Sequence, residues 1–179
     1  APVYQVHWGA KELKDLTGLL VSNGSKAAVR AVLVQAAKHG SKAHGLPGIG
    51  WVLGVHGVAT NPWTLAKTRA GMTGVALAAL IARTTEGPYV LVGHSLGARV
   101  MVTAAQTLAT QSGSPRIEAM HLLGAAVGRK GDWHSLNAAT SGVIWNYWSS
   151  NDNVLRWLYK MAEVGQEPVG QTGFKTPFP

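Results

Sequence analysis

One short run, residues 88–101, constrains the fold of this chain more than any other. It contains the pentapeptide Gly93-His94-Ser95-Leu96-Gly97, which has the pattern G-x-S-x-G. Residues 89–92 before it are apolar and rich in β-branched side chains, which predicts a buried parallel strand. After it, apolar residues recur at the spacing of one helical face: Val100, Met101, Ala104, Ala105 and Leu108. Strand, sharp turn and helix around a serine predict a nucleophile elbow, the turn that presents a catalytic serine above a sheet.

The residue types of the pentapeptide suit such a turn. A side chain at either flanking position is expected to collide with the neighbouring element, which favours Gly93 and Gly97. Ser95 would then expose its hydroxyl. The backbone N–H of Leu96 would lie at a helix N-terminus, where unpaired donors favour an oxyanion. The alternative is a Gly-Ser turn that joins a strand to a helix without any chemistry.

Composition limits the class of protein. The 179 residues suit one domain over 1–179, and a hydrophobic fraction of 46% is ample for a core. Only 13% of residues are charged, which is typical of a covered surface or of a piece of something larger. The chain has no Cys, which excludes disulfides and thiolate metal sites and leaves the compartment open. No pattern indicates a cofactor, a signal peptide or a transmembrane segment.

The formal net charge is +8. A basic surface is the simplest interpretation, and attraction to an anionic membrane surface is the functional alternative. Nucleic acid is not an expected partner, because the basic residues are scattered singly and no nucleic-acid motif is present.

Apolar periodicity predicts an α/β fold with a mostly parallel sheet flanked by helices. Strands are expected at residues 3–8, 89–92, 117–123 and 142–148. Helices are expected at 11–20, 26–38, 61–82, after Ser95, and at 154–161, with 51–60 ambiguous. Residues 128–136 are expected to form a loop that can include a helical turn, and the chain from 165 onward is expected to be a loop.

A serine nucleophile needs a histidine base, and the histidine needs an acid. The chain has three aspartates: Asp15, Asp132 and Asp152. Asp132 has the surroundings of a turn residue. Asp152 follows an expected strand, at the strand end where sites of this fold class lie, and it is the preferred acid. The alternative role for Asp152 is an N-cap for the helix from residue 154.

The histidine is the difficulty, since none of the seven lies after Asp152. His94 neighbours the nucleophile and is expected to point the wrong way. His121 is expected to pack inside a strand, and His134 to face solvent in a loop. Three explanations stay open: a missing segment supplies the base, a second chain supplies it, or the protein is not a working hydrolase.

A second oxyanion donor is equally open. His56-Gly57 resembles the H-G pair that follows an early strand in lipases. Its separation from Ser95 leaves no room for the strand and helix that normally intervene, so an absent segment is the alternative source.

Five segments together resemble the α/β-hydrolase superfamily of serine esterases and lipases. They are residues 61–63, 91–100, 122–125, 146–147 and 151–155, and the similarity is closest to the branch that includes the transmembrane and coiled-coil domain-containing proteins. Proteins of that branch carry a strand and a loop upstream of residues 3–8 and a histidine downstream of the acid. The resemblance therefore implies that residues 1–179 are the central part of a hydrolase domain, incomplete at both ends. It also implies that 51–60 is helix or loop and that His56 forms no oxyanion hole.

The function expected from these observations is serine hydrolysis of carboxylic esters. Ser95 would attack, Leu96 would hold the oxyanion, and Asp152 would orient a histidine. A lipid-like ester is the expected substrate, because seven Trp and a basic composition suit amphipathic ligands. The alternative is a non-catalytic module of the same fold that binds a protein partner or lipid.

Overall fold

The computed structural model describes residues 2–8, 62–111, 117–163 and 165–174. The chain divides into two compact units, residues 1–69 and 70–179. In the first unit, residues 2–8 adopt neither helix nor strand, so the strand predicted at 3–8 is wrong. An alternating pattern gives a strand only where a neighbouring strand completes the ladder. Here Val3 and Tyr4 are largely exposed. The helices predicted before residue 61 and the His56-Gly57 pair lie outside the described residues.

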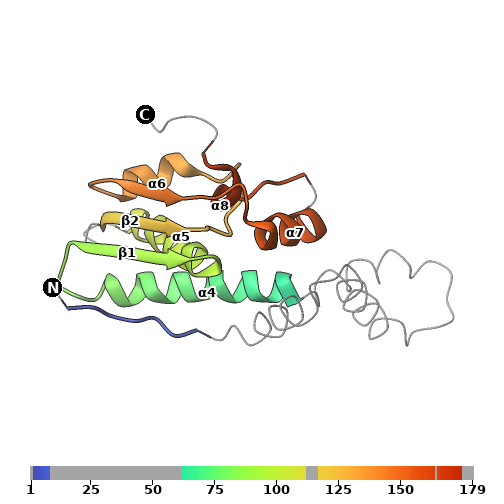
Figure 1. Ribbon diagram of the computed structural model, residues 1–179. Helices are drawn as coiled ribbons and strands as arrows, with labels where there is room; N and C mark the ends of the chain where they lie inside the picture. Colours follow the sequence, from blue (N-terminus) through green and yellow to red (C-terminus); the bar gives the residue numbers. More distant parts are fainter. Residues whose placement is uncertain (1, 9–61, 112–116, 164, 175–179) are drawn as a thin grey trace, which may run out of the picture. The chain divides into compact units, whose positions relative to one another are not determined.

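The second unit contains a three-stranded parallel sheet (Figure 1). Its strands are β1 (Tyr89–His94), β2 (Ile117–Leu123) and β3 (Ile144–Tyr147), in the order β1-β2-β3. The register places Val92 beside His121 and His121 beside Trp145. The predicted α/β fold with a parallel sheet is confirmed, and β3 is shorter than the predicted strand at 142–148.

Five described helices accompany the strands. They are α4 (Pro62–Ile81), α5 (Leu96–Ala109), α6 (Trp133–Ala139), α7 (Asn153–Ala162) and α8 (Val169–Thr172). Three match the predicted helices at 61–82, after Ser95 and at 154–161. Helix α6 begins in the segment predicted to be a loop that can include a helical turn, and α8 lies in a segment predicted to be a loop. Seven and four residues are too short to show a helical apolar period.

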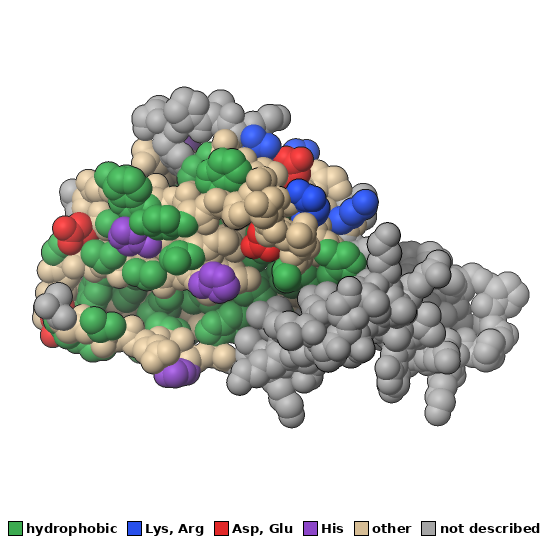
Figure 2. Space-filling model, viewed as in Figure 1, with side chains coloured by type: hydrophobic (Ala, Val, Ile, Leu, Met, Phe, Trp, Pro, Cys, Tyr) green, Lys and Arg blue, Asp and Glu red, His purple; other side chains and the backbone are tan. Residues whose placement is uncertain are grey.

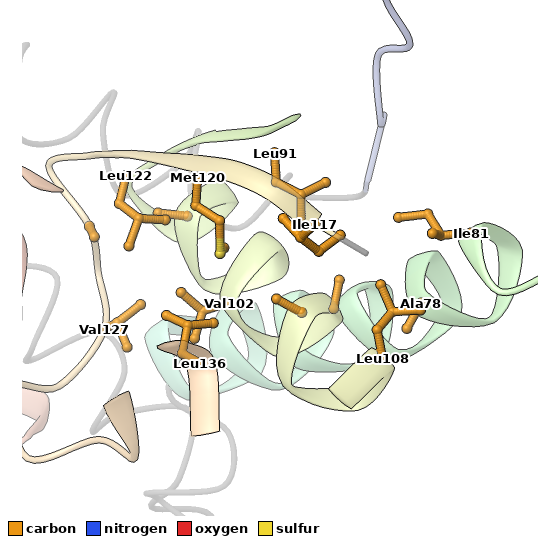
Figure 3. Packing of buried hydrophobic residues seen from close by; sticks show 14 of the residues in the cluster. Ala78, Ile81, Leu91, Val102, Leu108, Ile117, Met120, Leu122, Val127 and Leu136 are labelled. Atoms are coloured by element: carbon orange, nitrogen blue, oxygen red, sulfur yellow. The ribbon is translucent and has the colours of Figure 1, made fainter. Parts of the chain in front are cut away.

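The core lies between one face of the sheet and helices α5 and α6 (Figure 3). Right-handed crossovers explain why both helices cover the same face, since each connects one parallel strand to the next in the same direction. Helix α4 approaches α5 closely at Gly74, where an added Cβ would lie 2.6 Å from the Cβ of Thr103. The buried side chains of this cluster include Ala78, Ile81, Leu91, Val102, Leu108, Ile117, Met120, Leu122, Val127 and Leu136.

The opposite face of the sheet is exposed. Figure 2 shows hydrophobic and histidine side chains gathered over the strands on this face. Val92, Trp145 and Tyr147 are each exposed by half or more, although all three lie on strands of a parallel sheet. The alternation of exposed and buried residues along β1 therefore separates a packed face from an open one.

Candidate active site

The turn between β1 and α5 holds Ser95 in an unusual backbone conformation. Its φ is 54° and its ψ is −119°, and it is the sole non-glycine residue with positive φ in the part of the chain that the structure describes. Such a conformation costs about 1 to 3 kcal/mol and persists only where its surroundings impose it. Hydrogen bonds on both sides of the residue do so here. The Ser95 N–H donates to the Leu123 carbonyl (2.9 Å), and the Ser95 carbonyl accepts from the N–H groups of Ala98 and Ala126 (3.1 Å each).

The two glycines of the pentapeptide play different parts. A Cβ on Gly93 would lie 2.6 Å from the backbone N of Ala98 and 2.6 Å from the carbonyl oxygen of Gly97. Strand and helix thus approach so closely that only glycine fits at position 93. At Gly97 nothing lies within 4 Å of an added Cβ. The prediction that a side chain at Gly97 collides with the neighbouring element is therefore wrong, because that position faces open space.

The side chain of Ser95 is free of a capping role. Ser95 precedes the first residue of α5, but its side chain makes no capping hydrogen bond to the helix. The residue is half-buried. Leu96 begins α5, and its N–H is among the first four of the helix, which have no intrahelical partner. Its apolar side chain is buried, which anchors the first turn, while its role as an oxyanion donor stays a prediction.

Asp152 lies just beyond β3 and caps α7. Its Oδ1 accepts the N–H of Leu155 at 2.8 Å, so the capping interpretation is confirmed. Its other oxygen, Oδ2, lies 3.5 Å from the position of a Cβ built on Gly124. One oxygen of this half-buried carboxylate thus fixes the helix, and the other is directed toward the end of β2.

Asp132 provides a close comparison. It caps α6 in the same manner, with Oδ1 accepting the N–H of Ser135 at 3.0 Å, so it is a helix cap and not the predicted turn residue. This backbone hydrogen bond is the main cause that lowers the pKa of the Asp132 carboxyl below its ordinary value. Asp132 is exposed, and it precedes a helix that lies between β2 and β3 in the chain.

Gly124 lies where the ends of all three strands meet. It follows β2, its φ is 48°, and its N–H donates to the Tyr147 carbonyl at the end of β3 (2.9 Å). A Cβ there would lie 3.5 Å from Oδ2 of Asp152 and 3.8 Å from Nε2 of His94. The absence of a side chain at position 124 therefore leaves a gap that the carboxylate and the imidazole both border. In open α/β sheets, sites form at this carboxyl edge.

The described histidines occupy different places. His94 ends β1, is exposed, and carries its ring toward the gap beside Asp152, a juxtaposition that the sequence argument missed. His121 is half-buried on the open sheet face, where it stacks on Tyr147 with ring centroids 5.9 Å apart. His134 is exposed on α6, not in a loop. Among the described residues, no histidine hydrogen-bonds Ser95 or Asp152.

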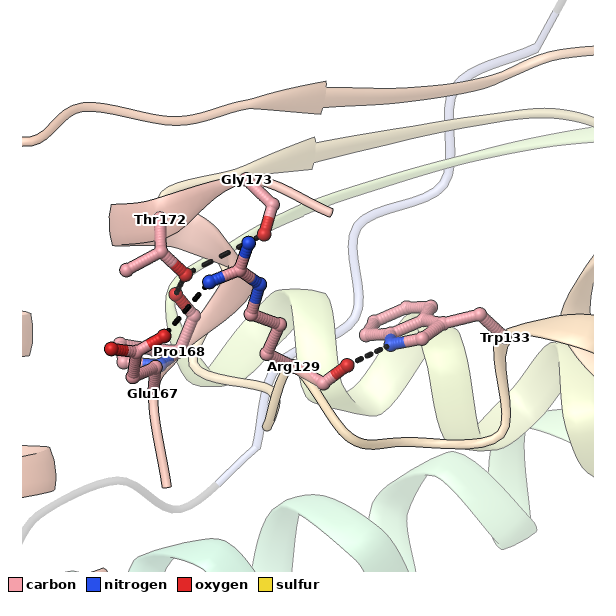
Figure 4. A network of polar contacts seen from close by, with 6 residues as sticks. All are labelled: Arg129, Trp133, Glu167, Pro168, Thr172 and Gly173. Carbon is pink, nitrogen blue, oxygen red and sulfur yellow. Dashed lines mark hydrogen bonds and ion pairs between the residues drawn. The ribbon is translucent and has the colours of Figure 1, made fainter. Parts of the chain in front are cut away.

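The short helix α8 supports the loop that follows β2. The N–H of Gly170 donates to the Ala125 carbonyl (3.0 Å), and a Cβ at position 170 would overlap the backbone of Gly124 and Ala125. A polar network reinforces this contact (Figure 4), in which Arg129 pairs with Glu167 at 2.8 Å and accepts at its carbonyl from the indole N–H of Trp133. Sequence patterns gave no signal for this support.

Two searches limit the chemistry of the described residues. No group of three His, Cys, Asp or Glu side chains among them is arranged to hold a metal ion. None of the helices in the described ranges combines the length and apolarity that crossing a membrane requires.

Comparison with known families places this chain in one of them. The family model described as "Protein of unknown function (DUF726)" matches residues 1–174. The chain belongs to this family. No solved structure is significantly similar to it.

Several curated proteins are similar over part of their length. An uncharacterised membrane protein of Caenorhabditis elegans is 31% identical over 83% of this chain and 25% of its own length. The transmembrane and coiled-coil domain-containing protein STS1 of Oryza sativa is 31% identical over 65% of the chain and 18% of its own length. The "Probable lipase MIL1" of Saccharomyces cerevisiae is 35% identical over 61% of the chain and 10% of its own length. The chain thus spans a quarter or less of each of these relatives.

The two glycines of the turn give a matched test of the elbow geometry. Gly93→Ala is expected to destabilise the protein by about 1 to 3 kcal/mol, because its Cβ would overlap the backbone of α5. Gly97→Ala is expected to be neutral or to stabilise by up to about 1 kcal/mol, since alanine is favoured over glycine within a helix. Thermal unfolding of both variants measures the difference. Equal melting temperatures would contradict the close approach of β1 and α5.

Proposed function

We propose that this chain is part of a serine hydrolase of the α/β-hydrolase type that cleaves carboxylic esters. The observation that carries the proposal is the backbone of Ser95. A serine with φ of 54°, between a parallel strand and a helix that approach within contact distance at Gly93, has the form that a nucleophile elbow requires. Similarity to a protein named a probable lipase adds support.

The proposed reaction proceeds in two steps. The Oγ of Ser95 attacks the ester carbonyl carbon and transfers its proton to a histidine base, and a tetrahedral oxyanion forms. The Leu96 N–H at the start of α5 donates to this oxyanion. The intermediate collapses as the histidine protonates the leaving alcohol, which leaves an acyl group on Ser95. Water, deprotonated by the same histidine, then attacks the acyl carbon; the bond to Oγ breaks, the carboxylic acid leaves, and the histidine returns the proton to Ser95.

Asp152 is the proposed acid of this triad. Its Oδ1 is engaged by the Leu155 N–H, which fixes the carboxylate, and its Oδ2 borders the gap above Gly124. The proposed histidine donates to Oδ2 through one ring nitrogen and accepts the Ser95 proton at the other. The histidine comes from outside the described residues, either from a further segment of the full-length protein or from a second chain.

Lipid-like esters are the proposed substrates. The formal net charge of +8 favours approach to an anionic phospholipid surface. Trp145 and Trp148 are each about half exposed, and indole rings suit the boundary between apolar and polar layers of lipid. Relatives named as membrane proteins are compatible with this setting.

The second candidate is a non-catalytic module that binds a lipid or a protein partner. It is favoured by one observation, that no described histidine bonds to Ser95 or Asp152. In such a module the strained backbone of Ser95 would have a structural role and no catalytic one.

Covalent labelling separates the two candidates. In the full-length protein, an alkyl fluorophosphonate is expected to react with Ser95, because the probe takes the place of the ester, its phosphorus bonds to Oγ and fluoride leaves. Mass spectrometry of tryptic peptides identifies the modified residue. Ser95→Ala is expected to abolish the label, whereas the matched control Ser135→Ala, which changes a half-buried serine on helix α6, should keep it. Labelling that persists in Ser95→Ala would overturn the assignment, and a full-length protein without label would favour the binding module.

The two capping aspartates allow the catalytic role of Asp152 to be separated from its role as a helix cap. Asparagine caps a helix about as well as aspartate, so Asp152→Asn and Asp132→Asn are both expected to leave the melting temperature nearly unchanged. A triad acid replaced by its amide loses up to about 10⁴-fold in rate with intact geometry. Hydrolysis of a p-nitrophenyl ester by the full-length protein should therefore collapse in Asp152→Asn alone. Near-full activity of that variant would place the acid elsewhere.

A further inference from the structure

Arg99 makes two hydrogen bonds that join the two parts of the proposed site. It lies on α5, one helical turn after Ser95, and is half-buried. Its Nε donates to the carbonyl of Ala126 at 3.0 Å. Its Nη2 donates to the phenol oxygen of Tyr159 at 3.3 Å. One guanidinium thus bridges the nucleophile helix, the loop after β2 and helix α7.

Each of these partners is directly connected to a site residue. The Ala126 N–H donates to the carbonyl of Ser95, so the residue whose carbonyl accepts from Arg99 also holds the strained serine through its N–H. Tyr159 lies on α7, the helix that Asp152 caps. The path from Ser95 to Asp152 through Arg99 therefore consists of the hydrogen bonds at Ala126 and Tyr159 and of helix α7.

The environment of Tyr159 makes this contact a firm one. The residue is 1% exposed, and burial raises the pKa of its phenol above the ordinary value, with Arg99 opposing that rise. The phenol is therefore neutral at pH 7, and its oxygen accepts from a charged donor inside the protein. Hydrogen bonds to charged groups are stronger than those between neutral groups.

We propose that Arg99 is a positioning residue that fixes the distance between Ser95 and Asp152 by bracing α7 against α5. The proposal rests on the proposed function. Its chemical basis is the planar guanidinium, whose fork satisfies Ala126 and Tyr159 together, whereas a lysine ammonium is a single point of charge. The expected consequence of losing it is a loss of alignment, and a displacement of about 1 Å in a catalytic constellation can cost about 100-fold in rate.

Two conservative variants of the full-length protein test this role. Tyr159→Phe removes the acceptor hydroxyl and keeps the buried ring. Arg99→Lys keeps the charge and loses the planar guanidinium that donates to both partners. Tyr89→Phe is the matched control, because it also removes a tyrosine hydroxyl, one that contacts Thr84 at 2.6 Å at the opposite end of β1. The rate of Ser95 labelling by a fluorophosphonate is expected to fall about 10-fold or more in both test variants. It should stay at the parental rate in the control.

A double-mutant cycle distinguishes positioning from general weakening of the fold. If Arg99 acts through Asp152, Tyr159→Phe should slow labelling strongly in the parent and by less than about 2-fold in the Asp152→Asn background. An equal slowing in both backgrounds, or parental rates in Tyr159→Phe, would overturn the positioning role. A parent that does not react at Ser95 would instead overturn the proposed function, and the positioning role with it.

Discussion

The backbone of Ser95 is held from outside its own turn, and the site depends on that restraint. The Leu123 carbonyl at the end of β2 receives the Ser95 N–H, and Ala126, three residues further on, donates to the Ser95 carbonyl. Both partners belong to the strand next to β1 and to the loop that follows it. A positive φ at a residue with a side chain is thus sustained by strand pairing and not by the turn alone.

The same loop gathers the other components of the site. Gly124 begins it, and its bare backbone borders both Asp152 and His94. The carbonyl of Ala126 accepts a hydrogen bond from Arg99, and the backbone around Ala125 packs directly on Gly170 of α8. The loop after β2 is therefore the common support of the serine and the carboxylate, and a shift of this loop would disturb both at once.

Local patterns in the sequence predicted the parts of this arrangement that depend on local physics. The apolar run before Ser95 and the helical spacing after it predicted β1 and α5. The place of Asp152 after a strand predicted its position at the sheet edge, and the helix that follows it suggested the cap as the alternative role. The pentapeptide pattern predicted that both Gly93 and Gly97 lie against the neighbouring element, but of the two only Gly93 does. At Gly97 the helix has already turned, so a Cβ there would point away from the strand. The strand predicted at 3–8 failed because alternation does not supply a pairing partner.

Features that depend on register could not be predicted. His94 pairs with Leu123, so the next residue along β2 comes to lie between the imidazole and the carboxylate. Nothing in the spacing of His94, Gly124 and Asp152 along the chain signals that meeting. The contacts from Arg99 to Ala126 and Tyr159 span 27 and 60 residues of sequence, and the support from α8 comes from a helix of four residues.

Residue-resolved amide hydrogen exchange tests the central claim, that strand β2 and its loop hold Ser95 in place. The Ser95 amide donates to the Leu123 carbonyl and the Ala126 amide donates to the Ser95 carbonyl. Both amides are therefore predicted to exchange as slowly as the amides in the centre of β2, through unfolding of the whole unit. Exchange of either amide at the rate of an exposed turn, while β2 stays protected, would contradict the claim that these two hydrogen bonds hold Ser95, and with it the proposed site.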